Sequence, residues 1–239
     1  MKQIIISIPF ILFMISCSMF KKTTPDISAE RLDSVMDKRN GHVYKTVKIL
    51  DQWWMMENLN VGKRIDGDGE QTNNDVIEKF CYKNDSLNCQ KYGGLYQWEE
   101  VMQYQSNDED TIFKGICPDG WHVPTDKEWM EMEIWLGMHN TQADDIGFRG
   151  ITEGDKLKVT EKCNQGKHCN MSGFSALMGG RRDHKGYFLG INVTANFWTA
   201  TSTDENQAWF RQLSNSSPQV KRDKAKQSSA YYVRCVKNE

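Results

Sequence analysis

The sequence predicts a loop-rich α+β domain linked by disulfides, with helices in its first half and short antiparallel strands in its second. Helix patterns occur between Gly93 and Gly137, whereas short apolar segments separated by turns follow from Gly173 onward. Strands and helices do not alternate as βαβ units require. Six of the seven cysteines come after the N-terminal leader, and an exported protein typically uses such an even set as disulfides.

The N-terminus has the pattern of a lipoprotein leader. Lys2 precedes a mostly apolar segment from Ile4 to Ile15, which is followed by Ser16 and Cys17. This segment is shorter than the ~20 apolar residues that cross a bilayer, and it fits a secretory signal peptide with a small-residue cleavage site. We expect a signal peptide over 1–16 and a lipid on Cys17 that attaches the protein to a membrane. An ordinary signal peptide with an unmodified cysteine is the alternative.

Residues 17–42 are polar and charged, and they are expected to form the lipidated tether that holds the domain clear of the headgroups. A short helix is expected within it, around 27–36. Because Ser18, and no acidic residue, follows Cys17, we expect the outer membrane as the location. The sequence leaves open whether the protein faces the periplasm or the cell surface.

The domain is expected to begin at Val43, where apolar and polar residues start to alternate. The alternation predicts strands over 44–49 and 53–59. A loop rich in Gly, Asp and Asn is expected over 64–74.

Two helices are predicted in the middle of the chain. The first follows Tyr96 and places Trp98, Val101 and Met102 on one face. The second begins at Thr125, because Thr125 and Glu128 have the spacing of a capping box. Its apolar stripe is expected to consist of Trp129, Met132, Trp135 and Leu136. Short strands are expected toward the end of the chain, over 174–177, 186–189, 195–200, 208–213 and 230–236.

The cysteine spacing favours three disulfides. Cys81 and Cys89 flank one polar loop, Cys163 and Cys169 flank another, and both pairs are expected to be local bridges. Cys117 and Cys235 remain, and they would join the middle of the chain to its C-terminal end. A zinc site at Cys163, His168 and Cys169 is the less favoured alternative, because it has no fourth ligand at a familiar spacing.

The composition limits the classes of partner. The net charge is −2, whereas nucleic-acid-binding proteins usually carry a basic stripe; no nucleic-acid partner is expected. Hydrophobic residues make up 38% of the chain, which is enough for a folded core.

Several segments resemble the Fibrobacter succinogenes major paralogous domain family over residues 43–237. They occur in the family's order: TVKILDQWWMMENLNVG, VIEKFCYKNDSLNC, YGGLYQWEEVMQY, GICPDGWHVPTDKEWMEME, SGFSALMGGRR, NFWTATS, AWFRQL and YYVRCVK. The resemblance implies a C-type-lectin-like fold related to formylglycine-generating proteins, with a closing Arg-Cys segment that brings the two ends of the domain together. The match is thin over 150–170, and the family supplies no biochemical activity to transfer.

The motif search gives no metal, cofactor or catalytic assignment. The segment from Asp66 to Glu70 resembles a calcium loop but lacks the Gly and Glu that an EF-hand needs at loop positions six and twelve, so a turn is favoured. His122 is expected to be a packed or hydrogen-bonded structural residue. Glu99 and Glu100 are adjacent on a helix, where neighbouring side chains point apart.

The expected function is that of a lipid-anchored, non-catalytic envelope protein that binds a glycan or a protein. The expected ligand-binding residues are Tyr187, Asn192, Asp204 and Arg182, whereas Trp198 and Trp209 are expected in the core. A structural assembly component with protein partners alone is the first alternative. An enzyme with a divergent site is the weaker one.

Overall fold

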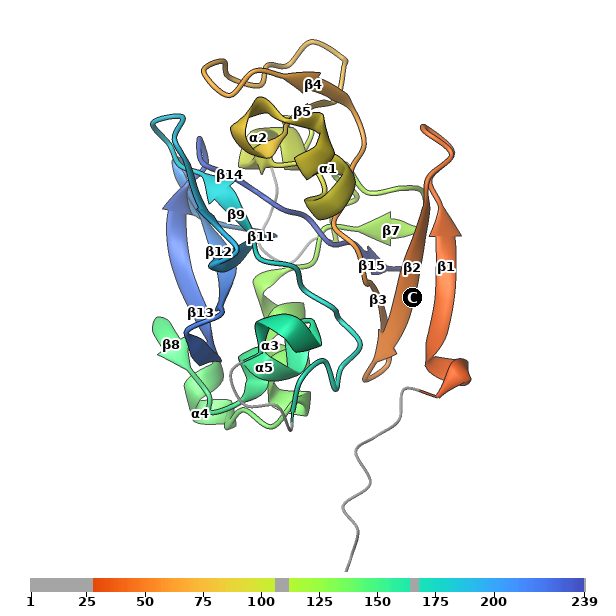
Figure 1. Ribbon diagram of the computed structural model, residues 1–239, viewed down its shortest axis with the longest axis vertical. Helices are drawn as coiled ribbons and strands as arrows, with labels where there is room; N and C mark the ends of the chain where they lie inside the picture. The colour runs from red at the N-terminus through yellow and green to blue at the C-terminus, as the bar shows by residue number, and fades with distance from the viewer. Residues whose placement is uncertain (1–27, 106–111, 164–167, 239) are drawn as a thin grey trace, which may run out of the picture.

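The computed structural model describes residues 28–105, 112–163 and 168–238, and contains two main sheets with helices between and below them (Figure 1). The five-stranded sheet has the order β1-β2-β3-β15-β7. The eight-stranded sheet has the order β6-β14-β9-β11-β12-β13-β8, with β10 paired to β9. A third sheet consists of β4 and β5. The predicted leader and the lipidation site at Cys17 lie outside the described residues.

The first sheet and the small sheet are formed by five strands from the first third of the described chain, one from its middle and one from its C-terminal end: β1 (Leu32–Met36), β2 (Val43–Ile49), β3 (Gln52–Met55), β4 (Lys63–Ile65), β5 (Glu78–Phe80), β7 (Trp121–His122) and β15 (Val236–Lys237). The large sheet is formed by β6 (Tyr96–Gln97), β8 (Gly147–Arg149), β9 (Gly179–Arg182), β10 (Phe188–Ile191), β11 (Thr194–Asp204), β12 (Gln207–Ser214), β13 (Ser217–Lys226) and β14 (Ala230–Tyr231).

The α-helices come from the middle of the chain: α1 (Ser86–Tyr92), α2 (Trp98–Val101), α3 (Asp126–Trp135), α4 (Asn140–Ala143) and α5 (Glu153–Leu157). Three short 3-10 helices are η1 (Ala29–Arg31), η2 (Tyr82–Asn84) and η3 (Thr160–Lys162).

The predicted α+β class agrees with this mixture of helices and sheets, but the order along the chain differs from the prediction. Five strands precede α1, so the α-helices occupy the middle of the chain rather than its first half. The strands β11 and β12 have 11 and 8 residues and are longer than the predicted strands over 195–200 and 208–213. The 10-residue strand β13 was not predicted. The pairings of β4 with β5 and of β9 with β11 are parallel.

The expected helix around residues 27–36 is wrong for the part that is described. After η1, residues 32–36 form β1, which pairs antiparallel with β2 from Leu32 opposite Val47 to Met36 opposite Val43. A chain that makes these ladder hydrogen bonds is part of the sheet. The folded part of the chain therefore includes residues that the sequence analysis placed in the tether.

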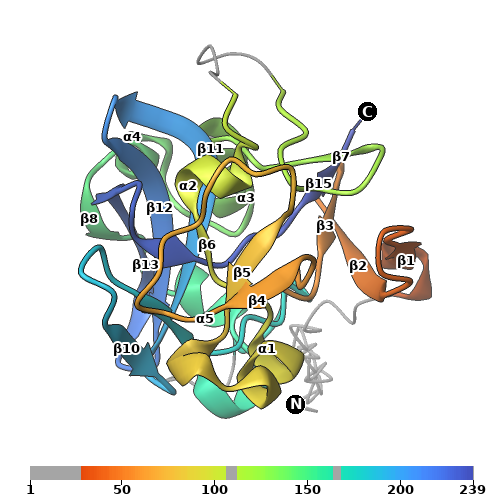
Figure 2. The same ribbon diagram turned by 90° about the horizontal axis from the view of Figure 1, so that it is seen from above.

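The C-terminal strand closes the five-stranded sheet. In Figure 2, β15 runs between β3 and β7, and Val236 lies opposite both Trp54 of β3 and His122 of β7. Cys235, directly before this strand, is bonded to Cys117. The two ends of the domain are thus joined by backbone pairing and by a covalent bond.

All three expected disulfides are present: Cys81–Cys89, Cys117–Cys235 and Cys163–Cys169. The sulfurs of Cys163 and Cys169 are therefore bonded to each other, which excludes the zinc alternative for these two residues in this state.

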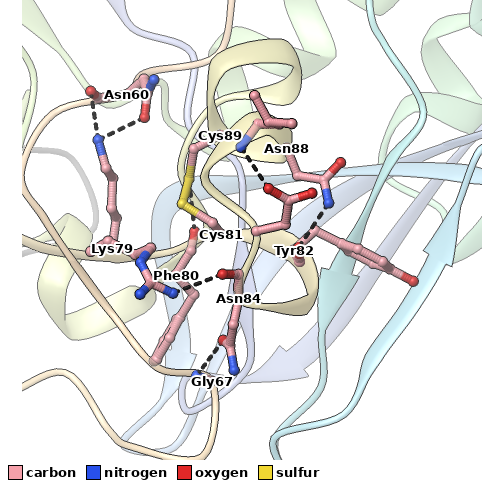
Figure 3. Close-up of a disulfide and its surroundings, with 12 residues drawn as sticks. Asn60, Gly67, Lys79, Phe80, Cys81, Tyr82, Asn84, Asn88 and Cys89 are labelled. Carbon is pink, nitrogen blue, oxygen red and sulfur yellow. Dashed lines mark hydrogen bonds between the residues drawn. A yellow bond between two sulfur atoms is a disulfide. The ribbon is translucent and has the colours of Figure 1, made fainter.

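Figure 3 shows the Cys81–Cys89 bond between the start of η2 and α1, with hydrogen bonds on both sides of it. The Asn84 side chain accepts the Gly67 N–H at 2.7 Å, and the Asn88 side chain donates to the Tyr82 carbonyl at 2.9 Å. The disulfide therefore lies inside a hydrogen-bonded loop cluster.

The core has two parts, each centred on a tryptophan. Trp129 of α3 makes edge contacts with Trp54 and Phe174, with ring centroids 5.2 and 5.4 Å apart. Trp198 of β11 stacks on Tyr231 with ring centroids 4.3 Å apart. Such aromatic pairs each contribute roughly 0.5–1.5 kcal/mol beyond the burial of their area.

The predicted stripe on α3 is correct except at one position. Trp129, Met132 and Leu136 are buried, but Trp135 is 43% exposed. The 3.6-residue period places positions 129, 132 and 136 on one face and turns position 135 away from it. Within the described part of the chain, no helix is long and apolar enough to cross a membrane.

Candidate binding cleft

A surface cleft of about 610 Å³ lies where the first turn of α3 meets β11, β12 and β13. We call it the Trp209 cleft. Hydroxyl, amide, carboxylate and ammonium groups surround one aromatic ring; the lining residues are Gln52, Ile112, Thr125, Asp126, Lys127, Glu128, Met130, Glu131, Thr201, Ser202, Thr203, Trp209 and Lys224.

The capping box at the start of α3, which the sequence predicts, fixes one wall of the cleft. The Thr125 hydroxyl accepts the Glu128 N–H at 3.2 Å, and the Glu128 carboxylate accepts the Thr125 N–H at 2.7 Å. The Asp126 N–H also donates to the Thr201 hydroxyl at 3.0 Å. The helix start is therefore attached to β11 through a side chain that lines the cleft.

A buried ionic network reaches the cleft through Asp126, which is one of the lining residues. The Asp126 carboxylate accepts hydrogen bonds from Arg211 at 2.5 Å and from Arg222 at 2.7 Å. The Glu133 carboxylate binds Arg211 at 2.8 Å and Arg149 at 2.6 Å. These five side chains come from α3, β8, β12 and β13, and each residue is at most 5% exposed.

The network compensates the cost of burying its charges. Burial raises the pKa of Asp126, but the positive charges and hydrogen bonds of Arg211 and Arg222 outweigh this effect, and the pKa lies below its ordinary value. Asp126 is consequently a carboxylate at neutral pH. The network is not completely hydrogen-bonded, because the buried Nε of Arg149 has no hydrogen-bond partner among the described residues. Its ion pairs nevertheless favour one arrangement of the elements, because separating them would leave buried charges uncompensated.

Trp209 was expected in the core, and this expectation is wrong. Trp198 is fully buried as predicted, whereas Trp209 is partly exposed and lines the cleft. The Arg222 guanidinium lies 3.5 Å from its ring centroid and the Lys224 ammonium 5.1 Å away. These cation–π contacts hold the ring in place.

Strand alternation explains the position of Trp209. It lies opposite Lys224 in the ladder, and Arg211 lies opposite Arg222, so all four side chains share one face of the sheet. The neighbouring positions Ala208 and Phe210 point to the opposite face and are buried. The alternation of Trp209 with Arg211 was the sequence signal for an aromatic residue on a polar face.

His122 is hydrogen-bonded on both ring nitrogens, as expected for a structural histidine. Its Nε2 lies 2.7 Å from Glu128 and its Nδ1 2.8 Å from Asn238, and the residue is 2% exposed. Burial lowers the pKa of His122, but the hydrogen bond and the charge of Glu128 raise it by more, so the pKa lies above its ordinary value. The same contact lowers the pKa of Glu128 against the opposing effect of burial.

Changing Glu128 to Gln should lower the pKa of His122, because it removes the negative charge and keeps a residue that can complete the capping box. A raised folded-state pKa stabilises the protein below the unfolded value, and this stabilisation is lost as the pH rises through the folded value. The stability advantage of the wild type over E128Q should therefore be present at about pH 6 and decline above about pH 6.5. Nuclear magnetic resonance titration of His122, with urea unfolding at several pH values, tests this. An unchanged His122 pKa in E128Q would contradict the ion pair.

The four residues predicted to bind a ligand do not meet in one site. Tyr187 lies in the turn between β9 and β10 and is 64% exposed. Asn192 lies in the exposed turn between β10 and β11, and Asp204 is exposed at the end of β11. Arg182 is 1% exposed.

The Arg182 guanidinium is committed to the protein itself. It donates to the carbonyls of Gly67 and Gly69, each at 2.8 Å, and to the Glu70 carboxylate at 3.0 Å. It therefore fixes the segment from Asp66 to Glu70, which is a turn, as the sequence analysis favoured. We do not assign ligand binding to Arg182.

The adjacent acidic residues Glu99 and Glu100 are also in separate environments, as expected. Glu100 is 1% exposed and accepts a hydrogen bond from the Tyr104 hydroxyl at 2.8 Å, whereas Glu99 is exposed. Over residues 28–105, 112–163 and 168–238, no group of three or more His, Cys, Asp or Glu side chains is placed to hold a metal ion.

The fold and the site define a disulfide-linked α+β domain in which the Trp209 cleft borders a buried ionic network at Asp126. The sequence profile of the Fibrobacter succinogenes major domain family matches residues 47–237, so the chain belongs to this family. The match includes every residue that lines the Trp209 cleft. No curated protein and no solved structure matches the chain.

Proposed function

We propose that the protein is a lipid-anchored envelope protein whose non-catalytic, C-type-lectin-like domain binds a glycan in the Trp209 cleft. The observation that carries the proposal is a partly exposed tryptophan, held by Arg222 and Lys224, inside an open cleft lined by hydrogen-bonding side chains. An aromatic ring covers the apolar face of a sugar, while polar groups around it accept and donate hydrogen bonds to the hydroxyls.

The arrangement of the cleft supports recognition by a preformed surface. Trp209, Thr201 and Lys224 come from three adjacent strands, and Glu128 comes from a capped helix. Because the ionic network joins these elements beside the cleft, little side-chain or loop ordering remains to oppose binding. The cleft volume of about 610 Å³ lies within the ~300–1,000 Å³ that is usual for small-ligand sites.

The remaining parts of the proposal rest on the sequence and on the family. The apolar leader that ends at Ser16 and Cys17 supports a lipid anchor, and Ser18 supports the outer membrane. The joined ends of the domain, through β15 and the Cys117–Cys235 bond, support the C-type-lectin-like assignment. Calcium has no role in the proposal, because Asp66 to Glu70 form a turn bound by Arg182.

Glycan-array binding of the oxidised mature chain carrying Cys17→Ala, with and without a calcium chelator, tests the proposal. A saturable hit that survives chelation is expected. If the array is blank and a pull-down from solubilised envelopes recovers one stoichiometric protein, the protein is an assembly component instead. Turnover of a polysaccharide or peptide would contradict the non-catalytic assignment.

Replacing Trp209 with Ala should weaken binding of the array hit by about tenfold or more, because the stacking surface is lost. Trp209→Phe should recover part of the affinity. The matched control is Tyr187→Ala, which removes a more exposed aromatic ring from a different turn and should leave affinity unchanged. Calorimetry measures the affinities, and circular dichroism checks the fold. Loss of affinity in Tyr187→Ala, with Trp209→Ala unaffected, would move the site to the β9–β10 turn.

A further inference from the structure

We propose that the end of the domain next to its N-terminus rests on the membrane surface through a patch of exposed apolar side chains. The patch, called here the end patch, consists of Leu32, Leu50, Trp135, Ile146, Phe148 and Ile151. The inference rests on the lipid anchor of the proposed function and adds an orientation and a lipid contact to it.

The end patch holds six of the fourteen large apolar side chains that are exposed on the described residues. Ile151 is 75% exposed and Ile146 60%, which makes them two of the most exposed members of that set. Single exposed apolar residues are normal on protein surfaces, whereas a group at one end marks an interaction site.

The patch residues lie on elements in the lower half of the molecule. In Figure 1 the β2–β3 turn and α4 lie at the lower end, with η1, where the described chain begins, at the lower right and β8 at the lower left. The Arg31 guanidinium lies 5.6 Å from the Trp135 ring centroid, and Arg31 also donates to the Lys48 carbonyl at 2.8 Å. These contacts join η1, the end of α3 and the strand that leads to Leu50.

Further contacts continue from α3 to the other patch residues. Lys156 of α5 donates to the Leu136 carbonyl directly after α3. Arg149 of β8, which lies between Phe148 and Ile151, binds Glu133 of α3 at 2.6 Å. The end of α3, the end of α5 and β8 therefore belong to one packed unit.

The position of the anchor identifies the lipid surface as the partner. Cys17 precedes Ser28, the first described residue, by 11 positions, and a chain of this length spans at most ~40 Å. The domain is therefore held near the bilayer, and η1 is the part of it closest to the anchor along the chain. Apolar side chains at this end meet the headgroup region whenever the tether is not extended.

The chemistry of the patch also fits an interface. Tryptophan is enriched at membrane–water interfaces, because its ring is apolar and its N–H is polar. The Arg31 guanidinium lies over the Trp135 ring and donates to the carbonyls of Lys48 and Ser172, so it holds the ring at this end of the domain.

The orientation has a consequence for the Trp209 cleft. The helix α3 begins at Asp126, which lines the cleft, and ends at Trp135 of the end patch. Its 10 residues separate the two along the helix by about 15 Å. Contact at Trp135 therefore leaves the wall of the cleft at the start of α3 free for a ligand.

Photolabelling of the lipidated full chain tests the contact. The protein is reconstituted in vesicles of phosphatidylethanolamine and phosphatidylglycerol that contain a lipid with a photoreactive headgroup, and labelled peptides are identified by mass spectrometry. Label is expected on the peptides with Trp135 and with Ile146 to Ile151. The peptide with Tyr187 to Val193, which also has exposed apolar residues, should stay unlabelled.

Two matched double variants test whether the labelling depends on the end patch itself or on exposed apolar side chains in general. Ile146→Asp together with Ile151→Asp should reduce the label on the Trp135 peptide several-fold. Tyr187→Asp together with Val193→Asp, which places the same charges in exposed turns elsewhere, should not reduce it. Both pairs are exposed, and circular dichroism confirms that the variants fold.

The experiment distinguishes failure of the contact from failure of the anchor. If the chain is lipidated and floats with the vesicles but labels both surfaces equally, the membrane contact is wrong and the anchor stands. If intact mass shows no lipid on Cys17 and the protein does not float, the anchor is wrong and the inference falls with it.

Discussion

Replacing both Cys117 and Cys235 with Ala should lower the free energy of unfolding by about 4–5 kcal/mol. The two residues are 118 positions apart and fully buried, and cross-linking a loop of this length removes much of the entropy of the unfolded chain. A typical domain has roughly 5–15 kcal/mol of stability in total. The variant should therefore be close to unfolding at physiological temperature, because β15 would be held to β3 and β7 by its backbone pairing and packing alone.

The matched control is the double replacement of Cys163 and Cys169, which also removes one disulfide. These cysteines are 6 positions apart, and the same entropy argument gives a loss of about 2 kcal/mol. Urea unfolding of both variants and of the wild type, all without reductant, measures the difference. Equal losses in the two variants would contradict the chain-entropy account.

Features set by neighbouring residues were predictable from the sequence. The capping box of Thr125 and Glu128 needs residues three positions apart, and it forms as expected. The disulfides Cys81–Cys89 and Cys163–Cys169 close short loops, and assigning them left Cys117 and Cys235 as the remaining pair. For the capping box and the two short-loop disulfides, the geometry is fixed within a few residues, so the sequence pattern determines the structure.

Features that depend on distant partners were missed. β1 has no buried residue, so its strand character comes from pairing with β2 rather than from a hydrophobic pattern of its own. β13 includes Arg222 and Asp223, and its polar sequence gave no strand signal. It is nonetheless a strand between β12 and β8, because its backbone is paired on both sides.

The candidate site was missed for a related reason. From the sequence, Arg182 was expected to bind a ligand and Trp209 to lie in the core, whereas Arg182 is buried and Trp209 lines the cleft. Arginine is enriched at binding surfaces and tryptophan is buried on average, so composition favoured the opposite assignment. An arginine can be buried when the protein supplies hydrogen-bond acceptors for its guanidinium group. The carbonyls of Gly67 and Gly69 are such acceptors for Arg182.

Changing Glu133 to Gln should destabilise the protein by about 3–5 kcal/mol, because it removes one charge from a buried network. The Glu133 side chain is fully buried and binds both Arg149 and Arg211. When Glu133 is replaced by the neutral Gln, Asp126 is the carboxylate that remains in the buried network, which still holds the guanidinium groups of Arg149, Arg211 and Arg222. The matched control is Asp144→Asn, which makes the same chemical change where Asp144 lies 3.5 Å from Arg222 with its side chain 87% exposed. An exposed ion pair is worth about 0–1 kcal/mol, so this variant should be nearly as stable as the wild type.

A double replacement separates the cost of an unpaired charge from the loss of a favourable contact. Glu133→Met alone should be strongly destabilising, because Arg149 keeps its buried charge. Glu133→Met combined with Arg149→Met removes the pair together, and apolar side chains of similar volume often replace a buried ion pair at little cost. The double variant should therefore be more stable than Glu133→Met. Urea unfolding at neutral pH measures the wild type, Glu133→Met alone, Arg149→Met alone and the double variant. A loss in the double variant that equals the sum of the two single losses would contradict coupling between Glu133 and Arg149. Coupling would mean that Glu133 and Arg149 stabilise each other when both are present. A rearrangement that separates α3 from β8 would then be unfavourable, and a preformed cleft requires such a fixed arrangement.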